Sequence, residues 1–358
     1  MKKIVLVKKV VSVVLISGML FCLGGITGCS KAKKSNTKTV VDCSGASVEI
    51  KNDIQRVIAP NQPFCSFMIA MGQGDKLIGS HGSVIGHTWA PYFKEDILSI
   101  EMYGYKPEAE LLYAANADLI VVKNSAYAEA LRNEGLPAIY FGYNNLDELM
   151  FAVDLMGEIF GDEAKEWGKC WKAELQGTID TINQDLSSLS ESDKKNVYYI
   201  NGAVNPGNLY TTFGGNSFTE YWINTIGANL VTSPYKDIEE IDQEVAISLN
   251  PDTIFISGYA EYTRYDELMA DPLWSDVVAV KNSSVYLMPT SLVSFDRFAV
   301  ELPLLLDYST NVLYPELHSF NGIDDFRKFF VDFYGVSFSD ANLNNMLLGL
   351  NPDGTRMD

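Results

Sequence analysis

The sequence predicts an α/β protein made of two lobes, each with a mainly parallel sheet, joined by one long rigid α-helix. Three observations carry this prediction. Short β-type runs alternate with helical segments in two separate regions of the chain, which is typical of βαβ units. One pattern occurs in both regions, as ELLYAANADLIVV at 110–122 and as EVAISLNPDTIFI at 244–256. Between the two regions, residues 145–190 contain neither a strand signal nor a proline.

The composition indicates a soluble globular protein with a large core. Of the 358 residues, 47% are hydrophobic and 20% are charged, so the chain is too apolar for a disordered protein. This length favours two domains over one. The net charge is −19 and no basic stripe is present, which argues against nucleic acid as a partner.

Residues 1–28 predict an export signal. Four lysines precede a long apolar run, and no acidic residue occurs there; a positive region followed by an apolar one is the pattern of such signals. An uncleaved membrane anchor is the alternative, because an apolar run of roughly 17 residues is just long enough to span a bilayer. Either reading places the rest of the chain outside the cytoplasm.

The segment ITGC, ending at Cys29, resembles the bacterial lipobox. The resemblance implies cleavage before Cys29 and attachment of lipid to its thiol, which would hold the protein at the extracytoplasmic face of the cell membrane. Residues 29–40 are polar and rich in lysine, so we expect them to form a tether near anionic headgroups.

The first lobe is expected over residues 41–144. A short hairpin at its start leads into strands predicted at RVIA, KLIGS, DLIVV and AIYFG. Helices are predicted between them at CSFMIAMG, EAELLYAAN and YAEALRNEG. This alternation favours a parallel sheet.

The second lobe is expected over residues 191–358 and shows the same alternation of strands and helices. Strands are predicted at NVYYING, TIFISG and SVYLMP, with helices at SFTEYWINTIG and DQEVAISLN. Two amphipathic helices close it, ELPLLLDYSTNVLY and IDDFRKFFVDFYG.

Residues 145–190 are expected to be connecting helices. Asn145 followed by Glu148 suggests a capping box at the start, and the Gly161–Asp162 pair is expected to break the first helix. A second helix is then predicted from Glu163 to Ser187, with apolar residues spaced at three and four, the pattern of a helix packed on one face. Such a helix is roughly 37 Å long, which makes it a stiff connector between the lobes.

Enzyme motifs are absent from the sequence. It contains no GxSxG, HExxH or Walker loop and only three histidines, so nucleophilic and zinc-dependent hydrolysis are disfavoured. A hydrolase built on paired carboxylates stays open, because acidic residues are plentiful. Cys43, Cys65 and Cys170 have no metal-binding spacing and could form one disulfide or remain as three thiols.

The signal, tether, repeat and connecting helix together resemble the class III (cluster A) substrate-binding proteins of ABC importers. The repeated E-x5-N-x-D-x-I pattern carries the resemblance, as do DPLWSDVVAVKNSSVYLMP at 271–289, SFDRF at 294–298 and LYPEL at 313–317. The resemblance implies two Rossmann-like lobes and a monomer without catalytic activity or cofactor. It also implies delivery of a ferric siderophore, haem, cobalamin or bare metal ion to a permease dimer with its ATPase.

Glu110 and Glu244 open the two copies of the repeat. By resemblance, one acidic residue at this place in each lobe pairs with arginines on the two permease subunits. Such rim charges steer and register a complex more than they tighten it. The alternative is that each glutamate only complements a helix dipole.

Ligand contacts are expected from loops at the carboxyl ends of the strands. The expected cleft segments are 60–66, 80–93, 102–105, 123–127 and 141–143 in the first lobe, and 205–217, 257–265 and 290–298 in the second. The expected ligand-binding residues in these segments are His81, His87, Trp89, Tyr103, Tyr143, Tyr210, Tyr259, Phe295 and Arg297.

The aromatic residues suit a large, flat or aromatic ligand, and Arg297, with Arg264 as a weaker candidate, suits an anionic one. A ferric siderophore is therefore the expected cargo, with haem, cobalamin, a metal ion or an oxyanion such as molybdate as alternatives. His81 and His87 are candidates for a metal contact, although the second-lobe loops offer no histidine partner. A sensor or interaction lipoprotein that kept the fold but lost transport is the rival from another class.

Overall fold

The computed structural model describes residues 36–201, 210–238, 240–257 and 261–357. The expected export signal, Cys29 and the tether as far as residue 35 lie outside these described residues. Within the described ranges, no helix combines the length and the apolar character needed to cross a membrane.

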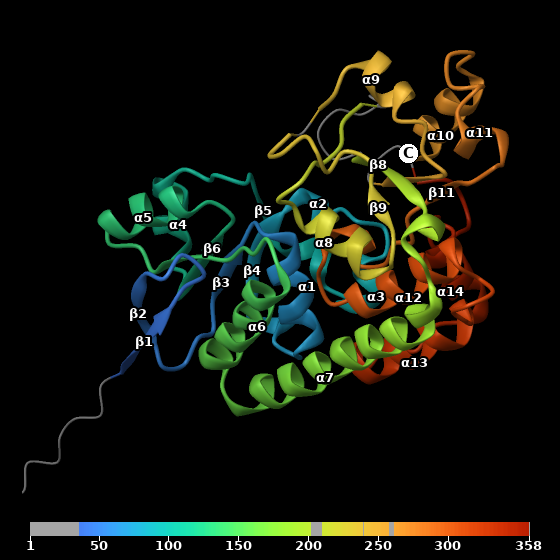
Figure 1. The fold of residues 1–358 in the computed structure, drawn as a ribbon. Coiled ribbons are helices and arrows are strands. Elements are labelled where there is room, and N and C mark those ends of the chain that lie inside the picture. The colour runs from blue at the N-terminus through green and yellow to red at the C-terminus, as the bar shows by residue number, and fades with distance from the viewer. Residues whose placement is uncertain (1–35, 202–209, 239, 258–260, 358) are drawn as a thin grey trace, which may run out of the picture. The chain divides into compact units, whose positions relative to one another are not determined.

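The first sheet has five parallel strands in the order β5-β4-β3-β6-β7. Its strands are β3 (Val57–Ala59), β4 (Leu77–His81), β5 (Glu101–Tyr103), β6 (Leu119–Val122) and β7 (Ala138–Tyr140). The central strands β3 and β6 are buried along their whole length, as expected of strands covered on both faces. Figure 1 shows the strands in blue to green, with α4 and α5 beside them.

The second sheet has four parallel strands in the order β11-β10-β8-β9. Its strands are β8 (Asn196–Asn201), β9 (Asn229–Leu230), β10 (Thr253–Ser257) and β11 (Val285–Leu287). Two parallel sheets flanked by helices confirm the α/β class. Residues 36–358 form one compact unit.

The hairpin before the first sheet consists of β1 (Thr37–Val41) and β2 (Ser47–Lys51), paired antiparallel. Strand β1 therefore begins inside residues 29–40, which were expected to form a tether. Val40 of this strand is buried in the core together with Val48 of β2. Asp42 follows β1, and its Oδ2 accepts hydrogen bonds from the Tyr140 backbone N–H and from Arg132 Nη1, each at 3.0 Å. This carboxylate ties the hairpin to β7.

The predicted helices occur in the predicted order, together with helices that were not predicted. In the first lobe they are α1 (Gln62–Ala70), α2 (Gly82–Ile85), α3 (Ala90–Phe93), α4 (Ala109–Ala115) and α5 (Ser125–Asn133). In the second they are α8 (Phe218–Thr225), α9 (Gln243–Ser248), α10 (Glu261–Ala270), α11 (Val278–Lys281), α12 (Leu302–Leu313), α13 (Gly322–Tyr334) and α14 (Asp340–Leu347). Several segments expected to be loops were wrong in part. Strand β5 covers half of 102–105, α2 and α3 lie within 80–93, and helices begin within 60–66, 123–127 and 257–265.

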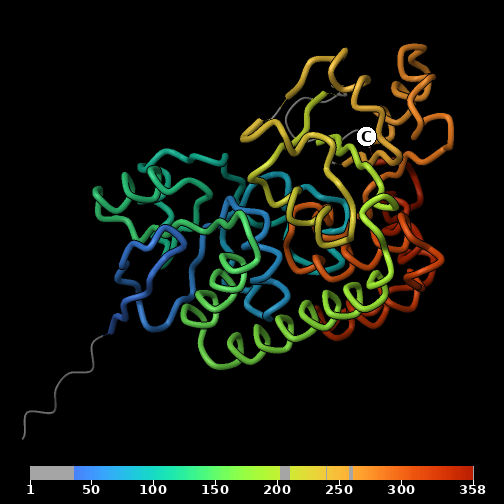
Figure 2. Tube along the Cα trace, viewed as in Figure 1, coloured from blue at the N-terminus to red at the C-terminus, as the bar shows by residue number. Residues whose placement is uncertain are grey.

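The connecting segment forms α6 (Leu146–Phe160) and α7 (Asp162–Asp185). Asn145 Oδ1 accepts the Glu148 N–H at 3.0 Å, and Glu148 Oε2 accepts the Asn144 N–H at 2.7 Å. Gly161 ends α6 with φ +98°, a conformation that favours glycine. Figure 2 shows the sharp turn of the chain there.

Helix α7 contacts both halves of the core through Trp171. This side chain is fully buried, and its ring meets Phe67 of α1 edge-on with centroids 5.0 Å apart. Its Nε1 donates to the Val300 carbonyl oxygen at 2.8 Å. Helix α7 also packs along α12, and Figure 1 shows it running past α12 and α13.

The repeated sequence forms the same local structure twice. Asn116 follows α4 with φ +48°, and Asn250 follows α9 with φ +43°. Asp118 Oδ2 then accepts the Arg56 N–H at 3.0 Å, just before β3, and Asp252 Oδ2 accepts the Asn196 N–H at 2.8 Å, at the start of β8. Each copy is therefore a short helix, a left-handed turn, and a carboxylate that anchors the neighbouring strand.

Candidate functional site

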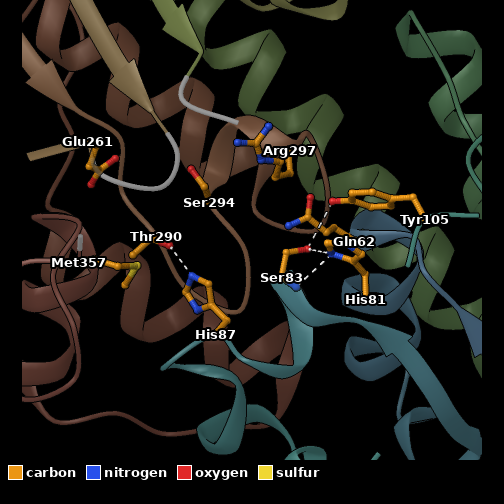
Figure 3. Close-up of a pocket in the computed structure, with 10 residues that line it drawn as sticks. All are labelled: Gln62, His81, Ser83, His87, Tyr105, Glu261, Thr290, Ser294, Arg297 and Met357. Carbon is orange, nitrogen blue, oxygen red and sulfur yellow. Dashed lines mark hydrogen bonds between the residues drawn. The ribbon is translucent and has the colours of Figure 1, made fainter. Parts of the chain in front are cut away.

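A cavity of about 170 Å³ lies where loops of the two lobes meet. First-lobe residues after β3 and β4 form one wall, and residues 290–297 with α10 form the other. Figure 3 shows the ten lining side chains, which are Gln62, His81, Ser83, His87, Tyr105, Glu261, Thr290, Ser294, Arg297 and Met357. The first-lobe side of this cavity is at the carboxyl ends of parallel strands, the usual place for ligands in such sheets.

A second cavity of about 290 Å³ adjoins the first. The two share Gln62, Tyr105 and Arg297 in their walls, so they are parts of one cleft. The second part adds Lys123 from the first lobe. Its full lining is Asn61, Gln62, Pro63, Tyr105, Lys123, Tyr140, Phe141, Gly142, Tyr143, Arg297 and Phe298.

Arg297 ends the 3-10 turn η5 (Phe295–Arg297) beside a buried carboxylate. Asp296 accepts hydrogen bonds from the hydroxyl groups of Ser257, Tyr199 and Ser294. Arg297 Nη2 lies 3.8 Å from Asp296 Oδ2. Burial alone would raise the pKa of Asp296, but Arg297 and the three hydroxyls outweigh it and hold that pKa below its usual value. The turn is thus fixed around an ionised carboxylate.

The residue after Arg297 is held from the other lobe. Phe298 has φ +52°, a left-handed conformation that costs a non-glycine residue roughly 1 kcal/mol. The Tyr143 hydroxyl donates to the Phe298 carbonyl oxygen at 2.7 Å, and the Phe298 ring stacks on Phe218 at 4.5 Å. Tyr143 lines the second cavity, so it contributes both to the wall and to the support of the Arg297 turn.

His81 and Tyr105 form a stacked pair in the first cavity, with ring centroids 3.7 Å apart. Lys123 Nζ lies 3.6 Å from the Tyr105 centroid. His81 Nδ1 accepts the Ser83 N–H at 3.0 Å, so the proton of the neutral ring is on Nε2. Burial and then the charge of Lys123 lower the pKa of His81. This ring is therefore a neutral hydrogen-bond donor at neutral pH.

His87 occupies the opposite side of the first cavity, near Met357 and Thr290 (Figure 3). Only 8% of it is exposed, and burial lowers its pKa to about 4. Its Nε2 lies 3.4 Å from Thr290 Oγ1. Among the described residues, no group of three or more His, Cys, Asp or Glu side chains is arranged to hold a metal ion.

Two of the expected ligand-binding aromatic residues are core residues instead. Trp89 is fully buried, and its Nε1 donates to the Leu350 carbonyl oxygen at 2.9 Å. Phe295 is also fully buried and packs on Phe326. Apolar burial against the C-terminal segments determines both positions, which corrects the expectation that they line the cleft.

Tyr103 and Tyr210 are elsewhere as well. Tyr103 belongs to the edge strand β5 and lines a separate groove beside α4. Tyr210 stacks near Trp274, with centroids 6.4 Å apart. The weaker candidate Arg264 is buried on α10 and lines neither cavity, and Tyr259 lies outside the described residues.

The cleft also contains residues that the sequence analysis did not select. Gln62, Ser83, Lys123, Thr290 and Glu261 all line it, and each belongs to a segment expected at the cleft. Of the described residues 210–217, none lines either part. Lys123 directly follows β6 and Ser83 follows β4 by two positions, so a polar side chain just after a strand could have indicated these two; the sequence analysis favoured aromatic residues instead.

Glu110 and Glu244 occupy the same position in their helices. Each is the second residue of its helix, α4 or α9, and each is exposed. Neither carboxylate belongs to the cleft lining.

The sequence model of a family described as periplasmic binding protein matches residues 68–292. Among curated proteins, none matches this chain.

Solved structures show the same fold at low sequence identity. A periplasmic solute binding protein from Veillonella parvula is 22% identical with a TM-score of 0.71, covering 88% of this chain and 97% of that one. The molybdate periplasmic binding protein MolA from Haemophilus influenzae, with molybdate bound, is 17% identical with a TM-score of 0.71, covering 84% and 99%. A periplasmic heme binding protein from Pseudomonas aeruginosa is 16% identical with a TM-score of 0.58, covering 75% and 96%.

Proposed function

Because this chain belongs to the periplasmic binding protein family, we propose that it is the substrate-binding lipoprotein of an ABC importer and captures an anionic metal chelate, first of all a ferric siderophore. The chelate would bind between the lobes and pass to the permease, without any bond being made or broken in it by this protein. Cys29 would carry the lipid anchor on the extracytoplasmic face of the membrane.

The position of Arg297 in the walls of both cavities carries this proposal. Its guanidinium offers bidentate hydrogen bonds to carboxylate, catecholate or hydroxamate oxygens. Lys123 adds a second cation, and His81 Nε2 adds a neutral donor. The stacked His81–Tyr105 pair and Tyr143 supply aromatic surface. Cations beside aromatic rings suit a large anion with aromatic character.

Titration of intrinsic tryptophan fluorescence tests the cargo. The probes are a ferric catecholate siderophore, a ferric hydroxamate siderophore, haem, cobalamin, molybdate and Zn²⁺. We expect saturable quenching by one ferric siderophore. Arg297→Gln should weaken that binding about tenfold or more, the usual cost of losing a charged hydrogen-bond partner of a desolvated anion.

Arg327→Gln is the matched control, because this arginine pairs with Asp324 and Asp340 on the surface of α13. Its binding curve should match that of the unchanged protein. If Arg297→Gln also binds the siderophore with unchanged affinity, the anionic-chelate proposal is wrong.

An oxyanion such as molybdate is the second candidate, and the size of the first cavity favours it. At about 170 Å³, this cavity is smaller than the roughly 300–1,000 Å³ of pockets for drug-sized ligands. Ser83, Ser294 and Arg297 place hydroxyl and guanidinium donors in its wall. A response to molybdate with none to the large chelates would establish this alternative.

Transport itself is tested at Glu110 and Glu244. Charge reversal of both (Glu110→Lys with Glu244→Lys) should leave ligand affinity unchanged and abolish uptake by cells, because the residues are exposed and outside the cleft. Uptake that persists would contradict docking through these residues. Ligand binding in cells that show no uptake even with the unchanged chain would favour a sensor lipoprotein.

A further inference from the structure

Met357 lines the first cavity although it lies far along the chain from the other lining residues. It reaches the cavity through residues 349–357, which follow α14 and which we call the 349–357 segment. Figure 3 shows Met357 on the side of the cavity where Glu261 and His87 lie. The three residues that the first cavity shares with the second, Arg297 among them, are on the other side. Met357 therefore stands at the end of the cleft that is away from the second cavity.

A tight turn fixes the course of the 349–357 segment. Asn351 organises this turn, since its backbone N–H donates to the Thr355 carbonyl oxygen at 2.9 Å and its Nδ2 donates to the Arg356 carbonyl oxygen at 2.8 Å. Leu350 and Arg356 form an antiparallel bridge. The chain thus reverses within the segment and brings Arg356 back beside Leu350, which places Met357 directly after this bridge.

The 349–357 segment is bound to both lobes next to the cavity wall. In the first lobe, the Thr88 hydroxyl donates to Asn351 Oδ1 at 2.9 Å, and Thr88 directly follows His87 of the wall. In the second lobe, Arg356 Nη1 donates to Asp266 Oδ2 at 2.6 Å. Asp266 belongs to α10, whose first residue lines the same cavity. These contacts hold the segment, and with it Met357, in one position relative to the cavity.

The 349–357 segment lies directly on the wall that it covers. Gly349 has φ +67°, and a β-carbon at this position would lie 2.1 Å from Glu261 Oε1, so the backbone passes over this carboxyl group at a distance that only glycine allows. Met357 is partly buried and packs against the main hydrophobic core. His87, on the same side of the cavity, is only 8% exposed. Solvent therefore hardly reaches this end of the cleft.

We infer that Met357 is a specificity-determining residue, which ends the first cavity and limits the part of a ligand that fits beyond Arg297. This inference rests on the proposed function and deepens it, because it divides the cleft into two compartments for one ligand. The smaller compartment, about 170 Å³, takes a compact group, which is one arm of a chelate or a single oxyanion. The larger one, about 290 Å³ and next to Lys123, takes the remainder of a chelate.

The two ends of the first cavity differ in chemistry, which orients the ligand. Arg297 and Ser83 place donors on the side of the second cavity, where they favour anionic oxygens. Glu261 lies near Met357 (Figure 3), and its acidic side chain opposes a ligand oxygen at that end. The flexible thioether of Met357 adapts to irregular gaps, so it limits the length of the bound group more than its shape. The oxygens of that group therefore face Arg297, and its opposite edge faces Met357.

Substitutions at Met357 change the length of the first cavity in both directions. Met357→Trp fills part of the cavity, whereas Met357→Ala lengthens it. Asn351→Ala tests the same point without changing the cavity wall, because it removes the side-chain bonds to Thr88 and to the Arg356 carbonyl that position the segment. The full chain is used throughout, and thermal unfolding of every variant verifies the fold.

Matched controls make the same chemical changes outside the cleft. Met269→Trp and Met269→Ala change a methionine of α10 that is 38% exposed and lines neither cavity. Asn183→Ala changes an exposed asparagine of α7. These variants should behave as the unchanged chain in both measurements below.

Nuclear magnetic resonance of the histidine side chains gives a measurement that needs no ligand. The chain has three histidines, so His87→Gln assigns the His87 signals. Burial lowers the pKa of His87 to about 4. Met357→Ala and Asn351→Ala should raise this pKa toward the usual value of about 6.5, because water then reaches the ring.

Calorimetric titration measures the effect on ligand binding. The probes are molybdate, a ferric catecholate siderophore and a ferric hydroxamate siderophore. Met357→Trp should weaken binding of the probe that the unchanged chain prefers about tenfold, the typical cost of an overfilled site. Met357→Ala should reduce the preference for that probe over the next best one about tenfold, because the group that limits ligand length is gone.

The possible failures are distinguishable. If the unchanged chain binds a probe and Met357→Trp binds it equally well, or Met269→Trp loses as much affinity, this inference is wrong while the proposed function stands. An unchanged His87 pKa in both Met357→Ala and Asn351→Ala would also overturn it, since the segment would then not close this end of the cleft. If the unchanged chain binds none of the probes, the proposed function fails and this inference fails with it, even where the His87 pKa shifts as expected.

Discussion

The Tyr143 hydroxyl donates a hydrogen bond to the carbonyl oxygen of Phe298, 2.7 Å away. Tyr143 follows the last strand of the first sheet, whereas Phe298 follows Arg297 in the second half of the chain. One bond between residues 155 positions apart therefore connects the wall of the cleft with the turn that presents its arginine.

Removing that hydroxyl should weaken both ligand binding and the fold. Tyr143→Phe removes the partner of a left-handed residue next to Arg297, so we expect ligand affinity to fall about fivefold while the free energy of unfolding falls by about 1 kcal/mol. Fluorescence titration and denaturant unfolding measure the two effects.

Tyr308→Phe is a matched control, since the Tyr308 hydroxyl also donates to a backbone carbonyl, that of Leu287, at 3.3 Å, and Tyr308 lines neither part of the cleft. This variant should keep full ligand affinity. Equal affinity of Tyr143→Phe and the unchanged protein would show that Arg297 needs no support from the first lobe.

His318 should make the protein more stable below neutral pH than above it. Its Nδ1 lies 2.8 Å from Asp185 Oδ2 at the end of α7, and its Nε2 lies 3.3 Å from Asp307 Oδ1 in α12. Burial alone would lower the pKa of His318, but the two carboxylates outweigh it and raise that pKa above 6.5. The stabilisation is complete below the unfolded-state pKa and is lost as the pH rises through the folded-state pKa.

Thermal unfolding between pH 6 and pH 9 measures this contribution. The unchanged protein should lose about 1 kcal/mol more than His318→Gln across that range. Parallel stability curves for the two proteins would contradict a charged His318 at the end of α7.

His87 should act in the opposite direction on the acid side. Burial lowers the pKa of this side chain to about 4, so the unfolded chain binds a proton more readily between pH 4 and 6.5. Stability should therefore fall as the pH decreases through that window, and His87→Gln should flatten the decline. A decline of the same slope in His87→Gln would assign the effect to other groups.

Trp171→Ala should be among the most damaging single changes. The ring is fully buried between α1 and the segment before α12, and removing such a side chain leaves a cavity that costs roughly 3–5 kcal/mol. Denaturant unfolding should show this loss. Phe151→Ala on α6, where 44% of the side chain is exposed, should cost far less. A comparable loss of stability in Phe151→Ala would contradict a special role of Trp171 in joining α7 to the core.

Substituting the asparagine in either left-handed turn of the repeat should change the free energy of unfolding by the same amount. Asn116→Ala and Asn250→Ala force a β-carbon into a positive φ and should each cost about 1 kcal/mol, whereas the glycine variants should be nearly neutral. Asn183→Ala, the same chemical change within helix α7, should be neutral or stabilising. A large difference between the Asn116 and Asn250 variants would contradict their structural equivalence.

The sequence by itself determined the α/β class, the two parallel sheets and the long helix. These features follow from local periodicity, since buried parallel strands are continuous apolar runs and a helix packed on one face has apolar residues at three and four. The predicted helix Glu163–Ser187 is observed as Asp162–Asp185. The matched Asn and Asp of the repeat also acquired the same turn and the same strand anchor twice.

Only the tertiary structure decided which loop side chains face the cleft. Trp89 and Tyr105 both belong to segments expected there, yet Trp89 points into the core because the Leu350 carbonyl, 261 residues away, accepts its indole N–H, whereas Tyr105 stacks on His81 in the cavity. Phe295 and Arg297 are two positions apart, and one is buried on Phe326 while the other lines both cavities. The direction of a side chain in an irregular loop depends on contacts with distant segments, and no local pattern records them.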